Sequence, residues 1–93
     1  MAFVASFKAV MEKRGSPASV LAFSVPTSAP TRLEILDLPG RLVRTLVNGP
    51  LAAGRYAFSW DGRDTGGRFL GAGMYFTRLV SGRRQAVRRL VRL

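Results

Sequence analysis

Glycine and proline interrupt this chain at short, regular intervals, and this feature constrains the fold most. The segments between them are roughly 5 to 9 residues long, which suits β-strands and is short for α-helices. Regular spacing of short strands between turns is typical of a β-sandwich. The expected turns and loops are Gly15-Ser16-Pro17, Pro26 to Pro30, Pro39-Gly40, Asn48-Gly49-Pro50, Gly54, Asp61 to Gly67, Gly71, Gly73 and Gly82.

The segments themselves agree with strands, because polar and apolar residues alternate along them. Residues 56–60 are the clearest case, with three aromatic side chains on one face and small residues on the other. The sequence therefore predicts an all-β, antiparallel sandwich of six to seven strands. The expected strands cover residues 19–25, 32–35, 42–47, 56–60, 74–80 and 85–93. The expected core residues are Leu33, Ile35, Tyr56, Phe58, Trp60, Tyr75 and Leu79.

Residues 1–15 depart from this pattern. Phe3, Phe7, Val10 and Met11 fall at helical spacing, although a strand through some of them is also compatible with the sequence. We expect a helical or loosely ordered N-terminal arm over residues 1–15 and one sandwich domain over residues 16–93. No segment resembles a signal peptide or a membrane span, since none approaches about 18 consecutive apolar residues.

The composition argues against catalysis. The chain has no His and no Cys, so the usual general base and thiolate ligands are missing. Asp61 and Asp64 are too few for a calcium site and lie beside Arg63, so we expect a structural loop and no metal, cofactor or small-molecule substrate. The net charge of +10 leaves nucleic-acid binding as an alternative, although no nucleic-acid-binding motif accompanies it.

The chain resembles a known family through Trp60-Asp61-Gly62-x-Asp64-x-x-Gly67 followed by Gly73-x-Tyr75. It is similar, over residues 16–93, to the immunoglobulin-like domain shared by the flagellar hook-capping protein and the C-terminal sorting domains of bacterial type IX secretion. The motif residues are Asp37, Gly40, Gly54, Tyr56, Trp60, Asp61, Gly62, Asp64, Gly67, Gly73 and Tyr75.

The resemblance implies a non-enzymatic bacterial module that export machinery recognises. Its expected location is extracellular or on the cell surface, secreted as part of a larger precursor. The alternative within the family is a scaffold for assembly, as in hook capping. Either role implies a protein partner.

The C-terminal strand is the expected partner-binding surface, because it is rich in arginine and its edge looks open to strand addition. The alternative is that these arginines only protect the edge from aggregation. The residues concerned are Arg83, Arg84, Arg88, Arg89, Leu90, Val91, Arg92 and Leu93.

Overall fold

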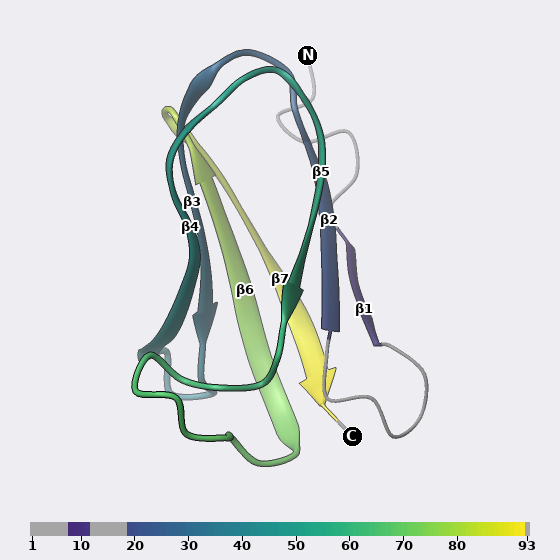
Figure 1. Cartoon of the computed structure of the whole chain (residues 1–93), viewed down its shortest axis with the longest axis vertical. Coiled ribbons are helices and arrows are strands. Elements are labelled where there is room, and N and C mark those ends of the chain that lie inside the picture. Colours follow the sequence, from purple (N-terminus) through teal and green to yellow (C-terminus); the bar gives the residue numbers. More distant parts are fainter. Residues whose placement is uncertain (1–7, 12–18, 93) are drawn as a thin grey trace.

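The computed structural model describes residues 8–11 and 19–92, and these form two antiparallel β-sheets without any helix (Figure 1). The strand order is β1-β2-β5 in the three-stranded sheet and β4-β3-β6-β7 in the four-stranded sheet. The predicted all-β sandwich is therefore confirmed. The strands are β1 (Lys8–Met11), β2 (Ser19–Val25), β3 (Ala29–Leu36), β4 (Leu42–Leu51), β5 (Gly54–Trp60), β6 (Gly73–Ser81) and β7 (Arg84–Arg92).

The connections divide the sandwich into two unlike ends. Residues 26–28, 52–53 and 82–83 form three short turns at one end, the upper end in Figure 1, which we call the turn end. Residues 37–41 and 61–72 form the connections at the opposite end, which we call the loop end. Antiparallel pairing throughout each sheet places these connections at the two ends.

The core fills the space between the two sheets. Five of the seven residues expected there are buried, namely Leu33, Ile35, Trp60, Tyr75 and Leu79, and burial of each contributes about 1.5–3 kcal/mol. The other two, Tyr56 and Phe58, are only half-buried because β5 is the edge strand of its sheet. Their rings still stack on the buried Phe23, with centroids 5.7 and 5.8 Å away.

Two sequence expectations are wrong in this region. Lys8–Met11 form β1, which pairs with β2, so the N-terminal arm adds a strand here and not a helix; the rest of residues 1–15 lies outside the described residues. Asn48-Gly49-Pro50 continues β4 and is not a turn. Proline is tolerated there because β4 is an edge strand, and Pro50 lies opposite Pro30, which also lacks an N–H group.

Polar side chains buried in the four-stranded sheet have partners. The hydroxyl oxygens of Thr31 and Ser81 lie 3.1 Å apart, which joins β3 to β6 on the inner face. On the outer face, Nε of Arg78 donates to Glu34 at 2.9 Å, and the Glu34 side chain is 6% exposed. These contacts fix the register between the two central strands, since a slip would leave buried polar groups unsatisfied.

Candidate protein-binding surface

The structure divides the predicted C-terminal surface into exposed residues and residues that are buried or half-buried. Arg83 and Arg84 lie exposed at the turn end, and Arg88, Arg89 and Val91 are exposed along β7. Leu90 is 1% exposed and belongs to the core, so its prediction as a partner contact is wrong. Leu93 lies outside the described residues.

Arg92 lies two residues after the buried Leu90, so the two side chains share a face of β7, and Arg92 is half-buried. Its guanidinium lies 5.2 Å from the centroid of the Trp60 ring, against which it packs as a cation on an aromatic face. Gly62 is buried next to it. Arg92 is thus part of the packing around Trp60.

The outer edge of β7 is less open than the sequence suggested. β7 is the last strand of the four-stranded sheet, but β1 of the other sheet lies in contact with it. Strand addition along this edge would therefore meet β1. The expected edge-binding role stays a prediction, and its geometry is less favourable than an open edge would be.

Trp60 anchors the loop that follows it. Its ring is fully buried and meets the Tyr75 ring edge-on, with centroids 5.4 Å apart, while its Nε1 donates to the carbonyl of Arg63 at 2.9 Å. Asp61 accepts a hydrogen bond from the Arg63 amide at 3.0 Å and pairs with Arg44. Within the described residues, no three His, Cys, Asp or Glu side chains gather as a metal site would require.

Two turns of the same construction lie at the loop end, at residues 37–43 and 64–70. Both read Asp-x-x-Gly-Arg followed by two apolar residues, a repetition that our sequence analysis missed. In each turn the Asp carboxylate accepts from the arginine's backbone N–H, at 2.7 Å for Asp37 and 3.0 Å for Asp64. It also pairs with that arginine's Nε, at 2.9 Å for Arg41 and 3.5 Å for Arg68. Gly40 and Gly67 have φ of 96° and 86°, a backbone conformation that residues other than glycine rarely adopt.

A tyrosine near the start of β5 and another near the start of β6 make the same kind of hydrogen bond. The segments 51–56 and 70–75 both read Leu-x-Ala-Gly-x-Tyr. The Tyr56 hydroxyl donates to the carbonyl of Ala52 at 2.6 Å, and the Tyr75 hydroxyl to that of Gly71 at 2.7 Å. Each ring thereby ties the start of its strand to the preceding loop, as the tyrosine corner of immunoglobulin-like domains does.

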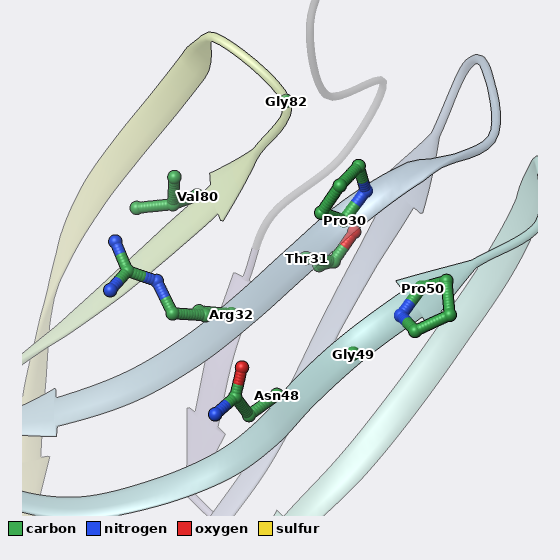
Figure 2. Close-up of a pocket in the computed structure, with 8 residues that line it drawn as sticks. All are labelled: Pro30, Thr31, Arg32, Asn48, Gly49, Pro50, Val80 and Gly82. Carbon is green, nitrogen blue, oxygen red and sulfur yellow. The ribbon is translucent and has the colours of Figure 1, made fainter.

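A shallow hollow of about 480 Å³ opens on the outer face of the four-stranded sheet, near the turn end (Figure 2). Arg32 lies opposite Asn48 on β4 and Val80 on β6, so these three side chains share that face. Pro30 and Pro50 form the next pair toward the turn end. A smaller hollow of about 130 Å³ adjoins it, and Gly82 lines both.

Charge is distributed unequally between the two ends. The loop end carries Asp37, Asp61 and Asp64, and each pairs with an arginine. The segments 26–32, 48–55 and 80–84 of the turn end contain no Asp or Glu. Their arginines are Arg32, Arg55, Arg83 and Arg84.

The fold and these surfaces define a small immunoglobulin-like β-sandwich domain, with polar turns at one end and a basic hollow at the other. Comparison with known families gives a more specific assignment. The model of the FlgD Ig-like domain matches residues 8–84, so the chain belongs to that family. The match includes β1, which the domain boundary expected at residue 16 leaves out.

Individual relatives agree with this assignment. The basal-body rod modification protein FlgD of Salmonella typhimurium is 38% identical over 66 residues, as is that of Salmonella typhi. These residues are 68% of this chain but 28% of each relative, so the chain spans little more than a quarter of those proteins.

Solved structures show the same fold. FlgD from Xanthomonas campestris, described in connection with hook capping essential for flagellar assembly, has a TM-score of 0.64 and 23% identity over 96% of this chain and 63% of that one. FlgD from P. aeruginosa has a TM-score of 0.66 and 25% identity over 95% of this chain and 66% of that one.

These comparisons correct one expectation and weaken another. The expected location, extracellular or on the cell surface as part of a secreted precursor, is wrong, because the relatives are flagellar basal-body and hook-capping proteins. The expected sorting role in type IX secretion finds no support among them. The alternative from the sequence, a domain of the hook-capping type, is the one that the family match supports.

Proposed function

We propose that this chain is a scaffolding domain for flagellar assembly of the hook-capping type, which acts by binding proteins and not by catalysis. The observation that carries the proposal is the family match across 8–84, which runs through all but the end of the sandwich. The relatives' names add the context, since they are a basal-body rod modification protein and a hook-capping protein.

The architecture supports a scaffold because the interior is filled by core side chains and the distinctive features lie at the surface. The buried side chains from both sheets form one core, and each described carboxylate at the loop end pairs with an arginine. Such a domain offers rigid exposed faces and turns, which are the parts of a β-sandwich that bind partners. Protein partners in the assembly are the ligands that the proposal implies.

A domain replacement in Salmonella typhimurium tests this proposal. The segment of its FlgD that aligns with this chain is replaced by the whole chain, and swimming in soft agar and hook formation by electron microscopy are measured. We expect the chimera to restore both functions at least in part to a strain that lacks FlgD.

The matched control is the same chimera carrying an unrelated immunoglobulin-like sandwich of similar size. We expect this control to leave the cells non-motile. The proposal fails if the first chimera is made at normal levels without restoring hooks, or if the unrelated sandwich restores them equally well.

A further inference from the structure

We propose that the hollow formed by Pro30, Arg32, Asn48, Pro50 and Val80 docks an acidic segment of a protein partner. Arg32 binds a carboxylate of that segment, and the side-chain amide of Asn48 donates a second hydrogen bond to it. The prolines and Val80 contact neighbouring apolar groups. This inference rests on the proposed protein-binding role and specifies the chemistry of the partner.

Charge is the first argument for an acidic occupant. Within the described residues, no carboxylate lies within ion-pair distance of Arg32 or Arg83. Arg32 is exposed, and the carboxylate of Glu34, two residues along the same face of β3, is paired with Arg78. A net charge of +10 also attracts acidic partners at long range.

Rigidity is the second argument. Arg32 and Asn48 lie directly opposite each other on paired strands, so their side chains leave the sheet side by side (Figure 2). Pro30 and Pro50, the next pair along, fix two backbone torsions beside them. A site built on strands and held in this way binds with little loss of conformational entropy.

The shape of the hollow favours a protein segment over a nucleic acid. Among the described residues, no aromatic side chain lines it, so they offer no stacking platform for bases. Its proline and valine walls suit the aliphatic side chains of a peptide, and a single guanidinium suits a single carboxylate, which it can bind through two parallel hydrogen bonds. The geometry thus combines one charged contact with apolar surroundings.

The test uses the purified full chain and a short fluorescein-labelled peptide of alternating glutamate and leucine residues. Fluorescence polarisation measures its affinity at near-physiological salt, and ¹⁵N–¹H NMR spectra locate the site. We expect saturable binding, with the largest shifts in residues 29–32, 48–51 and 80–84. Arg32→Gln should weaken binding about tenfold, since it removes a charge-assisted hydrogen-bonding group.

Arg89→Gln is the matched control. It makes the same charge change at an exposed arginine of the same sheet, away from the hollow. We expect less than a twofold effect. Equal losses in both variants would mean attraction by net charge alone and would overturn the proposal. So would a larger loss in Arg89→Gln, which would place the site on β7.

Two further outcomes would also overturn it. One is the absence of saturable peptide binding, and the other is tighter binding of a short DNA duplex than of the peptide with shifts outside the hollow. A peptide with lysine in place of glutamate should not bind. The peptide-binding measurements need no flagellum, so they are independent of the domain replacement. If the hollow does not bind the peptide, the domain replacement can still restore hooks, and if the replacement does not restore hooks, peptide binding can still be observed.

Discussion

Substitution of Gly62 by alanine tests the packing of Arg92 around Trp60. Gly62 is buried with φ of +82°, and a Cβ atom built there would overlap the Arg92 guanidinium. Because that group is the far end of a flexible side chain, it can move away. We expect Gly62→Ala to displace Arg92 from the Trp60 ring while the strands stay in place.

Two costs add in this variant. A left-handed backbone conformation costs alanine about 1–2 kcal/mol. The Arg92 guanidinium carbon lies 5.2 Å from the centroid of the Trp60 ring. Loss of this cation–aromatic contact at a partly desolvated site costs about 1–2 kcal/mol more. The free energy of unfolding should therefore fall by about 2–4 kcal/mol, a large part of the 5–15 kcal/mol typical of a small domain.

Urea unfolding followed by tryptophan fluorescence measures this change, and Gly67→Ala is the matched control. Gly67 has nearly the same φ, +86°, but no heavy atom lies within 4 Å of a Cβ built there. Gly67→Ala should lower the free energy of unfolding only by the cost of the left-handed backbone conformation, about 1–2 kcal/mol. In an Arg92→Ala background, Gly62→Ala should also lower it only by this backbone cost. Equal losses in the two single variants, or no coupling between Gly62 and Arg92, would refute the reasoning.

Three further predictions concern the polar contacts. Tyr75→Phe should lower the free energy of unfolding by about 1 kcal/mol, and Tyr56→Phe by less because its hydrogen bond is exposed; urea unfolding compares them. Glu34→Gln should cost about 1–2 kcal/mol by removing the charged acceptor of Arg78, and an unchanged unfolding midpoint would contradict this. Asp64→Ala should cost about 0.5–2 kcal/mol, and millimolar calcium should leave the melting temperature of the unsubstituted chain unchanged; a calcium-dependent rise would show that the loop binds metal.

Much of the fold could be predicted because local patterns and tertiary packing agree over most of the chain. Residues 56–60 alternate strictly, and Trp60 at their end is fully buried. The turn expected at Pro39-Gly40 is present, since the Gly40 amide donates to the Asp37 carbonyl at 2.9 Å and Gly40 has positive φ. Local chemistry decides such features.

The errors arose where long-range contacts decide. Lys8–Met11 can form a helix or a strand by spacing, and pairing with β2 selects the strand. In β7, apolar residues at both 90 and 91 left the inward face ambiguous, and the register with β6 places Leu90 opposite Tyr75 in the core. The hollow could not be predicted from the sequence, because it depends on the register that places Asn48 of β4 and Val80 of β6, a strand distant in sequence, on either side of Arg32.

The neighbouring positions of β1 and β7 determine how the domain would carry mechanical load. The two strands belong to different sheets, lie in contact and run in the same direction, toward the loop end (Figure 1). Tension between the start of β1 and the end of β7 therefore acts along the strand axes. It shears β1 against β2 and β7 against β6, so the ladder hydrogen bonds of each pair are loaded together and not one after another. Resistance to such pulling is governed by the rate of unfolding under load.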